Sequence, residues 1–126
     1  MSLLGLGTDI VNIKRIEKIL SKYKKKFIDK ILHSEEKKQK NITANFLSKK
    51  FAAKEAFSKA LGTGIGGVIN FNEIIIYNKS SGAPDIKIDK KAQKRVLKKL
   101  KVSKAKFFIS ISDDYPFALA TVIISK

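Results

Sequence analysis

The hydrophobic pattern of the N-terminal part of the chain predicts a strand followed by an amphipathic helix. Residues 3–11 form an apolar run that we interpret as a buried strand broken by Gly5 and Gly7. Asn12 comes next and is a residue type that caps helices. Apolar side chains then recur at helical spacing, at Ile13, Ile16, Ile19, Leu20 and Tyr23. This arrangement places Asp9 at the turn from the strand to the helix.

A longer helix is predicted at 42–61, because its apolar residues fall within about a third of the helix circumference at about 100° per residue. Those residues are Ile42, Phe46, Ala53, Phe57, Ala60 and Leu61. Glu55 and Lys59 lie off this stripe, on a flank that the core does not occupy. Gly62 and Gly64 follow, and glycine readily adopts the positive φ at which helices end.

The second half of the chain changes to the two-residue period of strands. The remaining predicted elements are a short helix at 27–32, a helix start at 34–36, strands at 71–77 and 85–88 joined by a turn at 78–84, a basic helix at 90–100, and strands at 106–112 and 117–125 joined by a turn at 113–116. Hairpin connections between consecutive strands favour an α+β fold in which a mostly antiparallel sheet packs against helices. The length predicts one domain, 1–126.

Charge restricts the partners without choosing among them. The chain has 27 basic and 11 acidic residues, a formal net charge of +16. Nucleic acid, an acidic membrane surface, an acidic protein and a phosphorylated cofactor all remain possible partners. The absence of cysteine excludes disulfides and Cys-ligated zinc. No export signal and no run of about 20 apolar residues is seen, so we expect a soluble cytoplasmic protein that does not enter a membrane.

Asp9, Glu55 and Lys59 are the residues from which chemistry is predicted. If the two carboxylates converge, they supply oxygen ligands for magnesium, while Lys54 and Lys59 balance the charge of a phosphate. Each has a simpler interpretation: Glu55 and Lys59 as an exposed ion pair worth about 0.3 to 0.5 kcal/mol, and Asp9 as a helix cap or part of an Asx turn. His33 is the only histidine, and with no cysteine or second histidine beside it we expect a surface or packing role.

A basic cluster covers the outer side of the first predicted helix and consists of Lys14, Arg15, Lys18, Lys22, Lys24, Lys25 and Lys26. Two interpretations stay open for it, a solvated lysine-rich face and a docking surface for an acidic partner. No interleaving of aromatic and basic residues typical of RNA recognition is present, which argues against nucleic acid as the partner.

Three stretches of the chain carry a resemblance to a known family. They are Gly5-Leu-Gly-Thr-Asp9-Ile-Val, Phe51-Ala-Ala-Lys-Glu-Ala-Phe-Ser-Lys-Ala-Leu-Gly-Thr-Gly64 and Phe108-Ile-Ser-Ile-Ser112. Together they resemble the holo-[acyl-carrier-protein] synthases, which are 4'-phosphopantetheinyl transferases of the short type. The similarity runs in register from the first residues to the last strand.

The resemblance implies a homotrimer with active sites at the subunit interfaces. Its reaction would move 4'-phosphopantetheine from coenzyme A to a serine of the acidic acyl carrier protein, releasing adenosine 3',5'-bisphosphate, in support of fatty acid biosynthesis. By position, Asp9 and Glu55 would bind magnesium and Lys59 would contact the transferred phosphate. The residues near coenzyme A would be Lys50, Lys54, Gly62, Thr63, Gly64, Gly66 and Ser110. The carrier protein would be held by Lys14, Arg15, Lys18, Lys22 and Lys25.

The sequence departs from the family pattern at two positions. Asp113 stands where the family commonly has histidine, so a role for an imidazole there does not transfer. Asp113, Glu55 and a metal-bound water all stay open as the base. Lys50 replaces the usual arginine, which keeps the charge and loses bidentate contact with phosphate. The alternative to an enzyme is a basic protein that binds nucleic acid without catalysis, and a third interpretation is a module that only holds an acidic protein.

Overall fold

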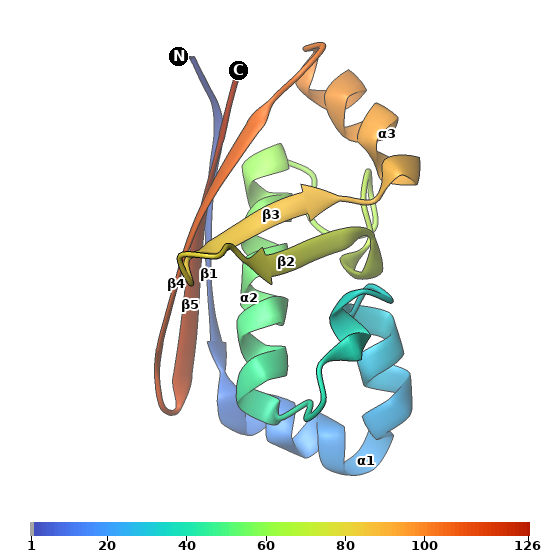
Figure 1. Cartoon of the computed structure of the whole chain (residues 1–126), viewed down its shortest axis with the longest axis vertical. Coiled ribbons are helices and arrows are strands. Elements are labelled where there is room, and N and C mark those ends of the chain that lie inside the picture. The colour runs from blue at the N-terminus through green and yellow to red at the C-terminus, as the bar shows by residue number, and fades with distance from the viewer. Residues whose placement is uncertain (1) are drawn as a thin grey trace.

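The central helix, α2 (Ala44–Leu61), packs on one face of a three-stranded antiparallel sheet (Figure 1). The sheet has the order β1-β5-β4, formed by β1 (Leu3–Asn12), β5 (Phe117–Ser125) and β4 (Lys106–Asp114). This computed structural model describes residues 2–126. Along β5 every second residue from Ala118 to Ile124 is fully buried, because side chains of a strand alternate between its two faces. The buried face is the one that α2 covers.

β1 runs through Gly5 and Gly7 as one strand, contrary to the sequence-based interpretation, and only its register with β5 shifts between Leu3 and Gly5. A Cβ atom at Gly5 would lie 1.9 Å from the carbonyl oxygen of Ala60, and one at Gly7 would lie 2.0 Å from that of Ala56. Any larger side chain would therefore push α2 off the sheet. The two glycines let the backbones of strand and helix approach each other, which is a requirement of packing rather than of chain reversal.

Helix α1 (Ile13–Ile31) begins where the sequence predicts, because the side chain of Asn12 accepts a hydrogen bond from the backbone N–H of Lys14 at 3.0 Å. The separate helix predicted at 27–32 is the last part of α1, which bends at Tyr23 (φ −133°, ψ 44°). Tyr23 is exposed, although its spacing predicted an inward position. The helix start expected at 34–36 leads only to a 3₁₀ turn, η1 (Glu36–Lys38).

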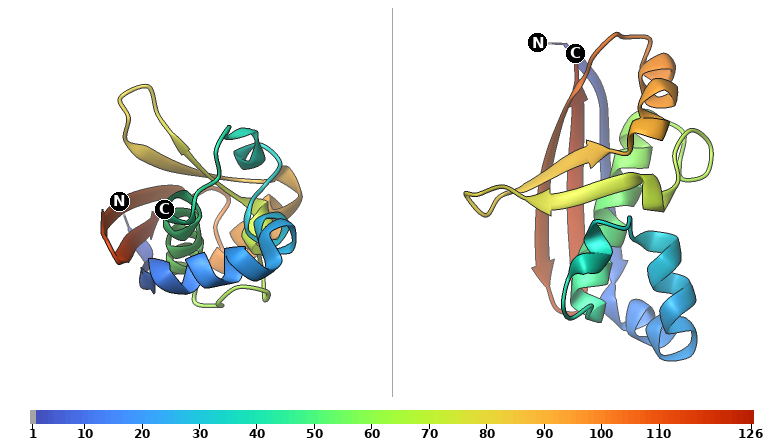
Figure 2. Two further views of the ribbon diagram at one scale, coloured as in Figure 1. Left: turned by 90° about the horizontal axis from the view of Figure 1, so that it is seen from below. Right: turned by 45° about the vertical axis from the view of Figure 1, so that its right-hand side comes forward.

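A second sheet consists of β2 (Ile74–Asn78) and β3 (Pro84–Ile88) and crosses α2 near its middle (Figure 2). The strand predicted at 71–77 begins three residues late, because its first residues form the 3₁₀ turn η2 (Phe71–Glu73). Helix α3 (Lys90–Leu100) has the predicted bounds. The predicted α+β class with antiparallel pairing is confirmed, with the strands divided between two sheets.

The hydrophobic core lies around α2, between the three-stranded sheet, α1 and the β2–β3 hairpin. Phe57 on α2 meets Phe107 on β4 edge to face, with ring centroids 5.1 Å apart. The predicted turn at 113–116 is shorter than expected, because β4 continues to Asp114 and only Tyr115 and Pro116 separate it from β5. Among the helices described within residues 2–126, none is both long and apolar enough to span a bilayer.

Candidate active site

A cavity of about 260 Å³ opens where β1, α1 and α2 meet. Asp9 enters it from β1, Arg15 and Ile19 from α1, and Phe51 and Glu55 from α2. The two carboxylates come from segments that are far apart in sequence. They share this cavity because the two glycines of β1 hold α2 against the strand.

Lys59 joins α2 to β1 at the edge of this site. Its Nζ lies 3.0 Å from Oδ1 of Asp9 and donates a second hydrogen bond, also 3.0 Å long, to the carbonyl oxygen of Thr8. Asp9 pairs with Ala120 within the strand ladder, so it lies inside β1 rather than at the predicted turn. The capping role considered for Asp9 belongs to Asn12. The Asp9 carboxylate therefore does not cap α1, and it lines the cavity while paired with Lys59 of α2.

The environment of Glu55 disfavours its ionised form. Burial raises the pKa of the Glu55 carboxyl above its ordinary value, the negative charge of Asp9 raises it further, and the Lys59 ammonium opposes both. Two carboxylates that repel each other in one cavity would both be stabilised by a shared cation. Within residues 2–126 no three His, Cys, Asp or Glu side chains gather to hold a metal. One or two carboxylates completed by water and phosphate are typical ligands of magnesium, so this donor pair fits that ion.

The glycine turn after α2 directly follows Lys59. Gly62 ends the helix at φ 80°, a left-handed conformation that suits glycine, and its N–H donates to the carbonyl oxygen of Lys59 at 3.0 Å. The N–H groups of Thr63 and Gly64 both donate to the carbonyl oxygen of Ser58 at 3.2 Å. The predicted cofactor residues of this turn, which also include Gly66, thus begin within one helical turn of Lys59.

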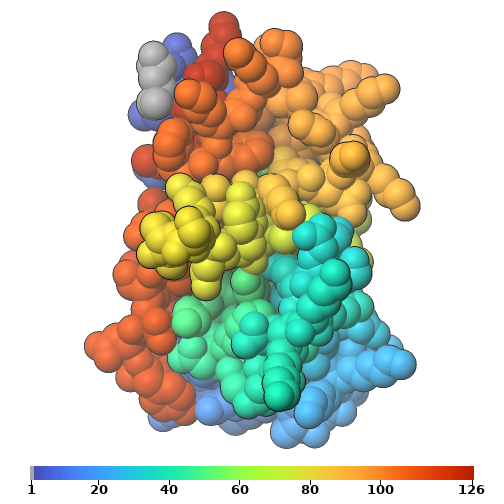
Figure 3. Space-filling model, viewed as in Figure 1, coloured from blue at the N-terminus to red at the C-terminus, as the bar shows by residue number. Residues whose placement is uncertain are grey.

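Other predicted cofactor residues are not brought to this cavity within one chain. Lys50 lines a different cavity of about 270 Å³ together with Lys49 and Asp113, and its Nζ donates to the carbonyl oxygen of Ile76. Ser110 is exposed and pairs with Thr121 in the sheet. Asp113 accepts a hydrogen bond from Nδ2 of Asn45 at 3.1 Å. This second cavity lies between α2, β4 and the β2–β3 hairpin, whose residues are yellow in the space-filling view (Figure 3).

Lys54 does not have the exposure that a cofactor contact requires, which corrects the prediction made for it. Its side chain is fully buried, and its Nζ donates to Oε1 of Glu36 and, at 2.6 Å, to the carbonyl oxygen of Ile31. Burial lowers the pKa of the Lys54 ammonium to about 8, against the opposing charge of Glu36. No surface of this side chain is left to meet coenzyme A.

Comparison with known proteins shows the family to which the chain belongs. The family model of the 4'-phosphopantetheinyl transferase superfamily matches residues 5–120. The chain belongs to this superfamily. It is 44% identical to the holo-[acyl-carrier-protein] synthase of Buchnera aphidicola over the whole of both chains. It is 42% identical to that of Orientia tsutsugamushi, with 96% of this chain and 95% of the relative covered.

Solved structures of the superfamily share the fold. The holo-[acyl-carrier-protein] synthase of Neisseria meningitidis superposes with a TM-score of 0.87 at 38% identity, covering 98% of this chain and 99% of the other. The Helicobacter pylori synthase in complex with coenzyme A has a TM-score of 0.82 at 35% identity, covering 95% and 99%. These relatives favour the enzyme over the nucleic-acid-binding alternative.

In this member of the superfamily the basic cluster lies beside the cavity. All seven of its residues are exposed on α1. Arg15 belongs both to the cluster and to the cavity wall. The positive surface of α1 is therefore continuous with the site that holds Asp9 and Glu55.

Sequence reasoning missed the buried acid Glu36, which it assigned only to a helix start. A signal for such a partner was present in α2. Lys54 precedes Phe57 by three positions, Ser58 by four and Leu61 by seven. These spacings place the four residues on one face of the helix, which is buried. A lysine on a buried face requires a carboxylate or carbonyl partner. The pattern does not reveal which acid supplies it.

Proposed function

We propose that the protein is a holo-[acyl-carrier-protein] synthase that transfers 4'-phosphopantetheine from coenzyme A to a serine of apo acyl carrier protein. The observation that carries this proposal is the cavity in which Asp9 and Glu55 converge with Lys59 bound to Asp9. The coenzyme A complex of the similar Helicobacter pylori synthase supports coenzyme A as the donor. The match of residues 5–120 to the family model supports one transferase domain over 1–126.

The reaction asks the protein mainly to position two substrates and to neutralise charge. The serine oxygen attacks the phosphorus that carries the pantetheine arm, and the bond from this phosphorus to the bridging oxygen breaks, so adenosine 3',5'-bisphosphate leaves. Lys59 stands where its ammonium can neutralise an oxygen of the transferred phosphate. Asp9 and Glu55 would hold magnesium, which when bound supplies further positive charge at the diphosphate.

The proton of the carrier serine requires an acceptor near this phosphate. Glu55 lines the cavity itself, and a water bound to the metal that Asp9 and Glu55 would hold is a second candidate. Asp113 lies outside the cavity of its own chain, so it would have to come from a neighbouring subunit. Replacement of Asp113 alone tests this third candidate, since activity that survives it leaves Glu55 or the metal-bound water as the acceptor.

The carrier protein is expected to dock on the basic cluster. An acidic partner would be attracted over long range by this exposed positive surface. Arg15 would meet it at the mouth of the cavity. A carrier that lies along α1 would thus present its serine beside Asp9 and Glu55.

The face of the three-stranded sheet that points away from α2 supports a homotrimer. Several large apolar side chains on it are exposed: Leu6, Ile10, Phe108, Phe117 and Leu119. The strand register places them on one face, since Leu6 and Phe108 both pair with Ile123. Monomeric proteins seldom expose this many large apolar side chains on one face of a sheet, and a second and third copy of the chain would cover them.

A cyclic trimer also unites residues that a single chain keeps apart. One side of α2 carries Glu55 and its cavity, and the other carries the cavity with Lys50 and Asp113. In a ring each subunit contributes opposite surfaces to its two neighbours. Lys50 and Asp113 of one subunit, and Ser110 of the sheet face, would then complete the cavity of the next.

The function is tested by incubating the protein with coenzyme A, magnesium and an apo carrier protein. We expect the carrier to gain the mass of one phosphopantetheine group while an equal amount of adenosine 3',5'-bisphosphate appears. Glu55→Gln should abolish the transfer, and Glu73→Gln, which changes an acid paired with Arg95 away from the cavity, should not. An unmodified carrier in the presence of folded wild-type protein would refute the proposal.

The shared site is tested by mixing subunits. Glu55→Gln and Lys50→Ala should each be nearly inactive as homotrimers. When they are mixed and allowed to exchange subunits, some sites receive both wild-type surfaces, so activity should return. No recovery after confirmed exchange would show that each site belongs to one chain, and the shared-site proposal would fail.

A further inference from the structure

The fully buried ammonium of Lys54 is paired in a way that links helices α1 and α2. It contacts Oε1 of Glu36 at 2.5 Å and the carbonyl oxygen of Ile31, the last residue of α1, at 2.6 Å. A charge without solvent contact is costly unless it is paired and hydrogen-bonded, and both conditions are met here. The pair therefore fixes α2 at this residue to the end of α1.

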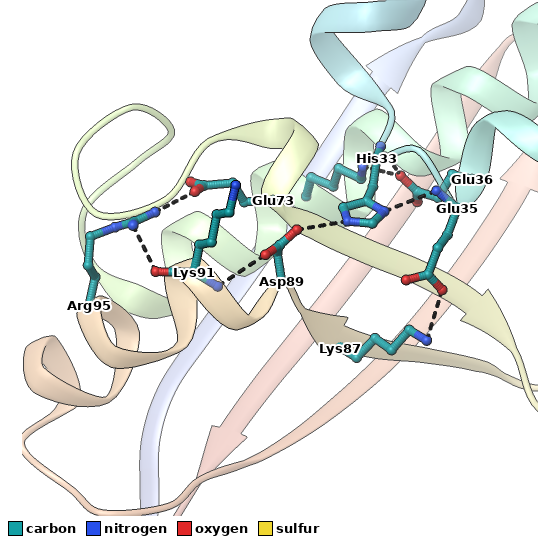
Figure 4. A network of polar contacts seen from close by, with 9 residues as sticks. His33, Glu35, Glu36, Glu73, Lys87, Asp89, Lys91 and Arg95 are labelled. Carbon is teal, nitrogen blue, oxygen red and sulfur yellow. Dashed lines mark hydrogen bonds and ion pairs between the residues drawn. The ribbon is translucent and has the colours of Figure 1, made fainter.

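Glu36 extends this link to two further segments. Its Oε1 accepts a hydrogen bond from the backbone N–H of His33 at 2.9 Å, and its Oε2 accepts one from the N–H of Ile76 in β2 at 3.0 Å. Figure 4 shows Glu36 beside His33, whose Nε2 lies 2.9 Å from Oδ2 of Asp89, the N-cap of α3. One buried carboxylate thus ties α2 to the exit of α1 and to the β2–β3 hairpin.

The two helices joined by Lys54 are the walls of the active-site cavity. Arg15 and Ile19 line it from α1, and Phe51 and Glu55 line it from α2. Phe51 also packs on Phe27 of α1, with ring centroids 6.4 Å apart. Apolar contacts of this kind are not directional, whereas the ion pair with its backbone hydrogen bonds sets both a distance and a rotation.

We propose that Lys54 and Glu36 are positioning residues whose pair holds α2 against α1 at the rotation that turns Glu55 toward Asp9. Lys54 immediately precedes Glu55 in α2, so a rotation of the helix at Lys54 moves the Glu55 carboxylate with it. Neither Lys54 nor Glu36 touches the substrate. This inference rests on the proposed function, and it replaces the coenzyme A contact that the family resemblance implies for Lys54.

The test is the double variant Glu36→Gln, Lys54→Met. Lys54→Met alone leaves the buried Glu36 carboxylate with only Lys50, whose Nζ lies 4.0 Å from Oε2, as an ion partner and is expected to unfold part of the chain, whereas neutral groups of similar size in place of both often preserve a fold. We expect the double variant to remain folded. Its kcat should fall by about 10²-fold, as for small displacements of catalytic groups. Its KM for coenzyme A should change less than about threefold, because uniform substrate binding is unaltered.

A matched control replaces an ion pair outside the cavity, Arg95→Met with Glu73→Gln, and should keep kcat and KM. A double variant at Glu36 and Lys54 with unchanged kcat would overturn the proposal. A raised KM with unchanged kcat would also overturn it, because displacement of Glu55 predicts a loss of kcat.

Amide hydrogen exchange separates this inference from the proposed function. In the absence of substrates, the double variant should exchange faster than wild type over residues 51–59 and at the end of α1, because the link between the helices is lost. If wild-type protein never modifies a carrier, the proposed function fails while this measurement still decides the positioning role. Unchanged exchange in both segments would overturn it.

Discussion

The ammonium of Lys59 lies 3.0 Å from the carboxylate of Asp9. One residue belongs to the last turn of α2 and the other to the interior of β1, so the contact spans the packing interface between helix and strand. The Lys59 side chain is 51% exposed, so its ammonium can also reach an incoming phosphate. The pair holds the acid in place and presents the positive charge at the rim of the cavity.

Lys59→Met is expected to lower kcat by about 10²- to 10³-fold, the range found when one preorganised charge partner of a transition state is removed. The free energy of unfolding should change by less than about 1 kcal/mol, since exposed ion pairs contribute little. Initial rates at saturating coenzyme A and a urea titration measure the two effects. A variant that keeps wild-type turnover would exclude Lys59 from the chemistry.

Glu55→Gln is expected to abolish transfer without lowering stability. The folded-state pKa of Glu55 is raised, so the carboxyl's contribution to stability is complete below its unfolded pKa of about 4.3 and is lost as pH rises through the folded value. Metal-free wild type should therefore be no more stable than Glu55→Gln at pH 7. Any difference in stability between metal-free wild type and Glu55→Gln should disappear as the pH falls toward about 4, where the carboxyl of Glu55 is protonated in both the folded and the unfolded state.

Thermal denaturation of both proteins in EDTA measures this difference. Glu73→Gln, in which an acid bound to Arg95 is replaced, serves as a comparison because that acid forms a favourable ion pair. A wild type clearly more stable than Glu55→Gln at neutral pH would contradict the repulsion between Glu55 and Asp9.

Gly7→Ala is expected to destabilise the protein by about 1 to 3 kcal/mol or more, as overpacking of a dense core does. The added Cβ would lie 2.0 Å from the carbonyl oxygen of Ala56, so β1 and α2 would have to separate. Gly67→Ala is the matched control, since its nearest neighbour is Cβ of Thr63 at 3.5 Å, an ordinary contact. Urea denaturation compares the two. Equal stabilities would show that β1 tolerates a side chain at Gly7.

Leu119→Glu is expected to convert the proposed trimer into monomers. Leu119 lies on the central strand of the exposed apolar sheet face with 41% of its surface accessible, so a charge there should leave the single chain folded. Light scattering during gel filtration gives the mass of wild type and variant. Tyr23→Glu, an exposed aromatic on α1 outside that face, should keep the wild-type mass. A trimer that survives Leu119→Glu would place the subunit contact elsewhere.

Local features of the sequence were sufficient to locate most elements and the central acids. Asn12 and Gly62 cap α1 and α2 as their residue types predict, and 90–100 forms the predicted helix. Glu55 and Lys59 were identified because their spacing removes them from the apolar stripe of α2. These features depend on hydrogen bonds and side-chain periods within a few residues, which the order of amino acids records directly.

Other features depended on which segments meet. Glycines such as Gly5 and Gly7 are typical of a break in a strand. Here they instead form a contact surface for α2, because Ala56 and Ala60 approach them. Lys54 has the charge of a phosphate ligand, yet Glu36 neutralises it inside the core. Neither partner can be read from local spacing, since a helical or strand period states which face a residue occupies and not what lies opposite it.

The sequence by itself therefore determined most of the elements, the caps of α1 and α2 and the chemical type of each candidate residue. The tertiary structure decided which charges are available to a substrate: Asp9 and Glu55 share a cavity, Lys54 is enclosed, and Lys50 faces a second cavity. The physical reason is that desolvation and pairing, which govern the behaviour of a charge, are properties of the packed surroundings rather than of the residue.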